Sequence, residues 1–133
     1  MSWQLLLAGA LALFGAAVHG ILGDRIVRRI ADDALPRNRF RGISTKFLIR
    51  VTWHITTIAF LVPGIGLVLV GAEPGAAAAT GVAYVAAAAF LSWSVLAFIA
   101  GFKHGGLQVF LSHPAPAIFL LTGALAAWGA AGL

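Results

Sequence analysis

The sequence predicts an all-α integral membrane protein, a four-helix bundle with both termini on the outer side of the membrane. Two observations predict this class. Only 10% of the 133 residues are charged and 61% are hydrophobic, whereas soluble domains carry about 25% charged residues. The apolar residues also form four runs near the length of about 20 residues that a helix needs to cross the roughly 30 Å hydrocarbon layer. We therefore expect one transmembrane domain over residues 1–133, without a separate soluble module.

Short polar or glycine-rich segments separate the expected helices. The first run lacks the positively charged start of a secretory signal peptide, so we interpret it as a retained helix. The stretches "GAEPG" and "GFKHGGLQ" are typical of turns. The predicted membrane helices cover about residues 3–22, 51–70, 76–102 and 114–132.

Basic residues are concentrated in one connection, which predicts the side that faces the cytoplasm. Eight of the nine Lys and Arg residues lie between Arg25 and Arg50, and the ninth is Lys103. By the positive-inside rule, the loop 23–50 and the turn at Lys103 are cytoplasmic, and Glu73 is outside. The net charge of +5 is then a topology signal, so we expect the lipid bilayer as partner and no nucleic acid.

The start of this loop, "DRIVRRIADDALP", has a helical pattern. Its apolar residues share one side, so we expect it to continue the first helix or to lie along the membrane surface as far as Pro36. Arg28 and Arg29 each precede an aspartate by four residues, a spacing that predicts ion pairs with Asp32 and Asp33 on a helix.

Small residues mark one side of the first helix. They recur at every fourth position from Ala8 to Gly20, a pattern that lets helices approach closely in lipid. On the neighbouring side, His19 lies one turn from both Gly15 and Gly23. The two glycines leave space over the imidazole ring, which we expect a neighbouring helix or a flat ligand to fill.

Each expected helix carries one histidine at or near its predicted cytoplasmic end. His19 and His54 are embedded in the first two helices, whereas His104 follows the third and His113 precedes the fourth. Ionisable residues inside membrane segments are costly and are functional-site candidates by default. We therefore expect a cytoplasmic-side histidine cluster. The alternative, a packing or capping role, suits the interfacial His104 and His113 better.

The first possible use of this cluster is haem binding. Opposed imidazoles of His19 and His54 would ligate a haem b between helices. Arg25 and Arg50 suit bidentate pairing with the propionates. Trp53 would pack on the macrocycle.

Two other uses remain open. Three or four imidazoles could bind zinc, copper or iron directly, with ligands drawn from His19, His54, His113, His104 and Asp24. Alternatively, His19 and His54 could relay protons or gate a polar path. The sequence holds no HExxH motif, and the eight residues between His104 and His113 match no familiar metal-finger spacing. The absence of cysteine excludes thiolate metal sites, Fe–S clusters and disulfides.

Three stretches, "AAVHGILGDRIVRR", "RVTWHITTIAF" and "SHPAPAIFLL", resemble a group of small bacterial four-helix membrane proteins of uncharacterised function. In that group a His followed by Gly and an acidic residue ends the first helix, and Trp-His-x-Thr occurs early in the second. The resemblance implies a shared site and no particular activity. The matching residues are His19, Gly23, Asp24, Trp53, His54 and Thr56, with His113 near the start of the last helix.

The sequence thus predicts a multi-pass protein of the bacterial inner (cytoplasmic) membrane that binds haem b or a transition metal, for redox chemistry or metal handling. The alternatives are a non-catalytic accessory subunit of a larger membrane complex and a small proton-linked transporter. A homo-oligomer or a larger complex is compatible with each of these functions. Enzymatic activity is expected only if the cofactor supplies the reactivity, and no catalytic residue is predicted.

Overall fold

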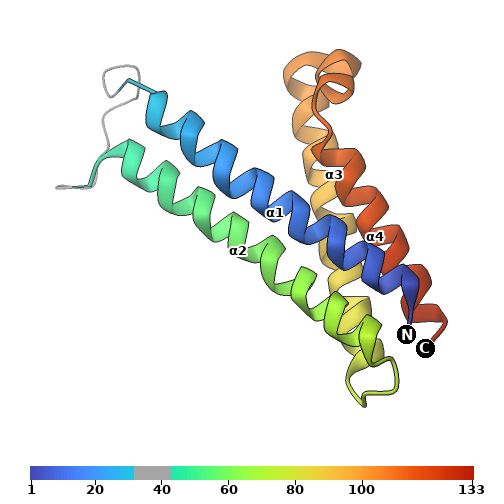
Figure 1. Cartoon of the computed structure of the whole chain (residues 1–133). Helices are drawn as coiled ribbons and strands as arrows, with labels where there is room; N and C mark the ends of the chain where they lie inside the picture. Colours follow the sequence, from blue (N-terminus) through green and yellow to red (C-terminus); the bar gives the residue numbers. More distant parts are fainter. Residues whose placement is uncertain (32–42) are drawn as a thin grey trace.

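The computed structural model describes residues 1–31 and 43–133, except for the side chains at positions 104, 107 and 109–112. The described residues form four α-helices, so the predicted all-α class with four helices is confirmed (Figure 1). Among them α1, α2 and the first part of α3, residues 79–103, are long and apolar enough to cross a bilayer, and α4 is a shorter apolar helix. The helices are α1 (Trp3–Arg29), α2 (Thr45–Ala72), α3 (Ala79–Ser112) and α4 (Ala115–Ala131).

The helices form two antiparallel pairs. Helix α1 packs along α2, α3 packs along α4, and the pairs meet mainly between α1 and α4. Figure 1 shows that the pairs converge at the end that holds both termini and the α2–α3 turn, here called the closed end. They diverge toward the opposite end, where α1 ends and α2 and α4 begin, here called the open end.

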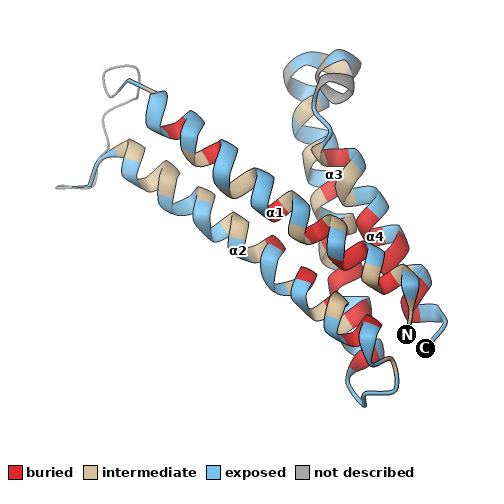
Figure 2. Ribbon diagram, viewed as in Figure 1, coloured by how far each residue is buried: buried red, intermediate tan, exposed pale blue. Residues whose placement is uncertain are grey.

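Small residues build the closed end. The predicted stripe on α1 is buried at Ala8, Ala12 and Ala16, and Figure 2 shows most of the buried residues where the pairs converge. A Cβ added at Gly9 would lie 2.9 Å from the carbonyl oxygen of Gly64, and one added at Gly64 would lie 3.0 Å from the Cβ of Ala12. The α1–α2 pair therefore depends on close backbone approach, as the small-residue pattern predicts.

A cluster of large aromatic rings follows at mid-height. Phe60 of α2 lies 4.9 Å, centroid to centroid, from both Trp93 of α3 and Phe119 of α4. Phe90 lies 5.0 Å from Trp93 in an edge-to-face contact. Rings at the level of Phe60 keep the two pairs farther apart than alanines do at the closed end, so the pairs diverge beyond them.

Both helices next to the basic loop are longer than the predicted membrane segments. Helix α1 continues to Arg29, and its last turns carry an ion pair between Arg28 and Asp24, 2.6 Å apart. The acid precedes the base by four residues, which is the favourable order on a helix. Helix α2 begins at Thr45 because the Ser44 hydroxyl accepts a hydrogen bond from the Phe47 N–H. The predicted partners Asp32 and Asp33, and Pro36, lie outside the described residues.

The predicted turn after the third helix corresponds to a break inside α3. Gly105 and Gly106 have non-helical dihedral angles, and Gly106 has φ 63° and ψ −154°. This conformation is nearly restricted to glycine. The chain is helical before and after the break, so α3 extends to Ser112, while its apolar segment long enough to cross a bilayer ends at Lys103, close to the predicted residue 102.

The close approach of α1 and α2 predicts a steric effect at Gly9. We expect Gly9→Ala to lower the free energy of unfolding in detergent by about 1–3 kcal/mol, because the added methyl group overlaps α2 backbone and forces the helices apart. Gly81→Ala is the matched control, since a Cβ there meets no described atom within 4 Å. Equal stability of the two variants in a denaturation series would contradict the packing argument.

Candidate functional site

His19 of α1 and Trp53 of α2 form a stacked pair between the two helices. Their ring centroids are 4.4 Å apart and the ring planes differ by 7°. The Trp53 indole Nε1 donates a hydrogen bond to the backbone carbonyl of His19 at 2.8 Å. This bond satisfies the indole donor inside the helix pair, and the stack holds the imidazole ring in one orientation.

The two glycines beside His19 have different neighbours. A Cβ at Gly23 would overlap the Trp53 indole, so this space is filled by the neighbouring helix. A Cβ at Gly15 would meet no described atom within 4 Å. Of the two spaces expected over the imidazole, one is therefore closed by Trp53 and the other is open.

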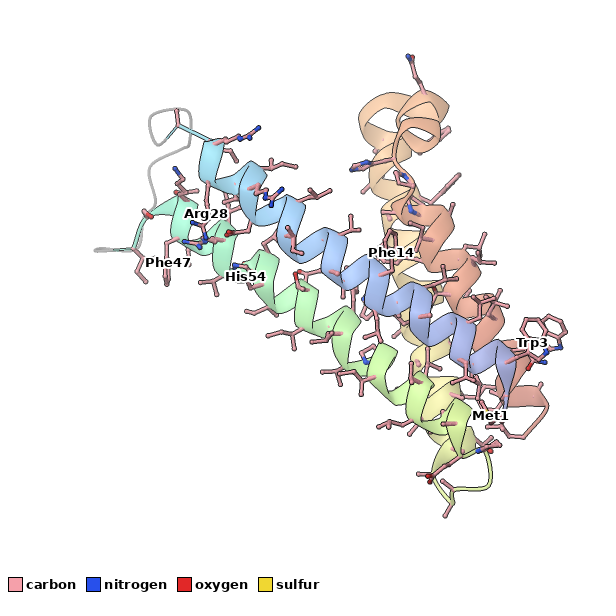
Figure 3. All side chains as sticks on the ribbon, in the orientation of Figure 1. Met1, Trp3, Phe14, Arg28, Phe47 and His54 are labelled. Carbon is pink, nitrogen blue, oxygen red and sulfur yellow. The ribbon has the colours of Figure 1, made fainter. Side chains whose placement is uncertain are left out.

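An apolar cavity of about 300 Å³ lies beside Gly15 and His19. It is here called the His19 cavity. Its walls come from α1 (residues 14–26), from Trp53 and Phe60 of α2, and from residues 113–119 at the start of α4. Phe14, labelled in Figure 3, belongs to this wall. The cavity thus lies between the two helix pairs, on the side of the aromatic cluster toward the open end.

The His19 Nε2 atom is buried and has no hydrogen-bond partner among the described residues. Unpaired buried polar atoms are rare in native proteins, and each one requires an explanation. The ring cannot easily turn toward another acceptor, because Trp53 stacks on its face and Phe60 meets it edge-on at 5.3 Å. The His19 Nε2 atom is therefore a buried polar atom without a partner among the described residues, in a residue that lines an apolar cavity.

A second hollow, of about 390 Å³, also borders His19 and Trp53. It runs along the side of α2 that carries Thr45, Thr52 and Thr56. The Thr56 hydroxyl donates to the carbonyl of Thr52 at 2.9 Å, the usual arrangement for threonine in a helix. The stacked pair therefore lies between an apolar cavity and a hollow bordered by threonines.

His54 belongs to a different group of residues, here called the ion cluster: Asp24, Arg28, Arg50 and His54. Asp24 accepts hydrogen bonds from the Nε atoms of Arg28 at 2.6 Å and Arg50 at 2.7 Å. The His54 Nε2 lies 3.4 Å from the same carboxylate. Figure 3 labels Arg28 and His54, which lie near one another on α1 and α2.

The structure separates the two histidines that the haem hypothesis had paired. His54 follows Trp53 directly, so it points about 100° around α2, toward Asp24 and not into the His19 cavity. His113, expected as a metal ligand, lines the cavity together with His19. Within the described part of the chain, no group of three or more His, Asp or Glu residues could hold a metal ion. The predicted four-histidine cluster is therefore not found there; the His104 side chain lies outside the described residues.

The arginines predicted to pair with haem propionates also differ in their surroundings. Arg50 is bound to Asp24, whereas Arg25 is exposed on α1. The Asp24–Arg50 ion pair was not anticipated. Its signal in the sequence is that opposite charges end one membrane helix and begin the next at the same boundary. The contribution of Phe60 and Phe119 to the site had no sequence signal, because phenylalanine is common in membrane helices.

Comparisons with protein-family models, with curated proteins and with solved structures find no match to this chain.

The contrast between the two glycines predicts different effects of the same substitution. We expect Gly23→Ala to destabilise the protein by about 1–3 kcal/mol, because the methyl group displaces the Trp53 indole. Gly15→Ala should be neutral or slightly stabilising, since alanine favours a helix over glycine. Thermal unfolding of both variants in the same detergent measures the difference. If the Gly23→Ala and Gly15→Ala proteins were equally stable, the Trp53 indole could not occupy the space beside Gly23.

Proposed function

We propose that this chain is an integral membrane protein that binds haem b in the His19 cavity, where the His19 imidazole would hold the haem iron. The observation that carries this proposal is the buried Nε2 of His19, which has no partner among the described residues and belongs to a residue that lines an apolar cavity open beside Gly15. A haem iron takes one or two ligands from the protein. A directly bound zinc ion takes three or four, and no such group exists among the described residues.

Several neighbours of His19 suit a flat apolar ligand. The stack on Trp53 holds the imidazole in place, and the walls at Phe14 and Phe119 offer aromatic surface. The volume of the cavity is at the lower end of the range of about 300–1,000 Å³ for ligand pockets.

His113 is the candidate for a second residue that would hold the iron, because it lines the cavity just before the start of α4. This assignment replaces His54 of the sequence-based hypothesis. Arg25 is the candidate partner for a propionate, since Arg50 is held by Asp24. A bound haem would supply one-electron redox chemistry, and the chain supplies the ligand and the apolar surroundings.

We also propose that the helices span the bacterial inner membrane with both termini outside. The 21 residue-to-residue steps from Trp3 to Asp24 correspond to about 32 Å of helix, close to the roughly 30 Å of hydrocarbon. Trp3 and Trp128 make an edge-to-face contact at 5.3 Å, as expected for an aromatic belt at one interface. His19 would then lie about 8 Å inside the opposite boundary. Helix α4, at about 26 Å, requires slight local thinning of the bilayer.

The proposed topology predicts the result of cysteine labelling. The chain has no cysteine of its own, so in a variant with one introduced cysteine all labelling comes from that cysteine. We expect Glu73→Cys to react with a membrane-impermeant maleimide in intact spheroplasts, and Ser44→Cys to react only after permeabilisation. The reverse pattern would place the basic loop outside and contradict the proposal.

Haem binding is tested with protein purified in mild detergent from cells supplied with iron and haem precursor. We expect a Soret band with split visible bands, lost in His19→Ala. His113→Ala should retain some haem with altered visible bands, because one axial ligand is replaced.

His54→Ala is the matched control, since His54 contacts the ion cluster and not the cavity; it should keep full haem occupancy. Gly15→Leu should lower occupancy by filling the open space. Full occupancy in His19→Ala, or a colourless wild-type sample, would exclude the haem proposal. A colourless sample without bound metal would favour the accessory-subunit or transporter alternatives.

A further inference from the structure

We infer that the ion cluster is a binding site for one anionic phospholipid, whose phosphate is held by Arg28, Arg50 and His54. This inference depends on the proposed membrane insertion but not on haem binding. The cluster and the His19 cavity occupy different sides of the α1–α2 pair, because His54 points away from Trp53 toward Asp24.

Among the described residues, the charge of the ion cluster is not balanced. Two guanidinium groups face one carboxylate, which leaves a net charge of +1 before His54 is counted. The acid is also the least accessible member: the Asp24 side chain is 15% exposed, against 62% for Arg28 and 43% for Arg50. The cluster therefore presents cationic groups to its surroundings, with the carboxylate behind them.

The members of the cluster suit a phosphate. Asp24 fixes both guanidiniums through their Nε atoms, so the two arginines are held side by side from different helices. Guanidinium groups recognise phosphate oxygens through paired hydrogen bonds. His54, with a side chain 48% exposed, adds a nitrogen at the same level.

The position of the cluster distinguishes a lipid from a free anion. Asp24 lies at the proposed hydrocarbon boundary, where lipid phosphates are found. On α2, the residues 4, 7 and 11 positions after His54 continue the same face of the helix. All three are exposed and apolar: Ile58, Leu61 and Ile65. A cationic group next to an exposed apolar strip matches a molecule with an anionic head and an acyl chain.

The experiment measures lipid binding to the detergent-purified protein by native mass spectrometry. Phosphatidylglycerol and phosphatidylcholine with identical acyl chains are compared, and inorganic phosphate is the third ligand. We expect phosphatidylglycerol to bind most tightly. Arg28→Gln and Arg50→Gln should each weaken it about fivefold, the effect of one basic residue near an anionic lipid surface.

Arg29→Gln is the matched control. It removes the same charge from the same end of α1, but residue 29 lies five positions from Asp24 and so on a different side of the helix. We expect it to keep the wild-type affinity. Equal weakening by Arg29→Gln and Arg50→Gln would show diffuse attraction and overturn the site. Equal binding of the two lipids would overturn the site as well. Binding of inorganic phosphate as tight as that of phosphatidylglycerol would also overturn it, because it would show a site for a free anion.

Arg50→Lys is a second variant that is less prone to misfold, because it keeps a positive charge opposite Asp24. It removes the guanidinium group that would form paired hydrogen bonds with a phosphate. It should bind phosphatidylglycerol more weakly than the wild type and more tightly than Arg50→Gln. Circular dichroism and haem content of the same samples separate the two proposals. Loss of lipid preference with intact haem content would implicate the ion cluster, whereas a wild type without haem that still prefers phosphatidylglycerol would overturn only the haem proposal.

Discussion

The contact between the Trp53 indole and Gly23 sets the register of α1 against α2, and both candidate sites depend on that register. The indole fits only where α1 has no side chain, and there it stacks on His19 and donates to the His19 carbonyl. Asp24 follows Gly23, and His54 follows Trp53. Because Asp24 and His54 are the chain neighbours of Gly23 and Trp53, the same register also brings the His54 imidazole beside the Asp24 carboxylate. The same contact places His19 at the wall of the cavity and brings the members of the ion cluster together on another side.

The difference between the two ends of the bundle comes from the size of the side chains. In lipid, helices gain little from hydrophobic burial against each other, so close packing and polar contacts decide how they associate. Alanine and glycine allow the pairs to approach at the closed end, as the buried Ala8 and Ala126 show. The rings around Phe60 prevent the same approach farther along. The cavity beside His19 is a consequence of this change.

The two groups of polar residues differ in how far they are satisfied. The carboxylate of Asp24 is bound by two arginines, so it is a poor candidate for a metal ligand. The Nε2 of His19 has no partner among the described residues. A buried polar atom without a partner costs free energy, and a ligand that binds it would recover that cost. This asymmetry is why the proposed cofactor is assigned to His19 and the proposed lipid to the arginines.

The helical class, the approximate helices and the small-residue face of α1 could be predicted from the amino-acid order, because run length, composition and spacing along one helix are local properties. The position of His19 between two glycines could be read in the same way. The packing of the helices was needed to show that Trp53 fills the space at Gly23, that Gly15 lines a cavity, and that His113 and not His54 shares it with His19. These outcomes depend on the rotation of each helix about its axis. That rotation is set by contacts such as the one between His19 and Trp53, 34 positions apart, which no pattern within a single helix contains.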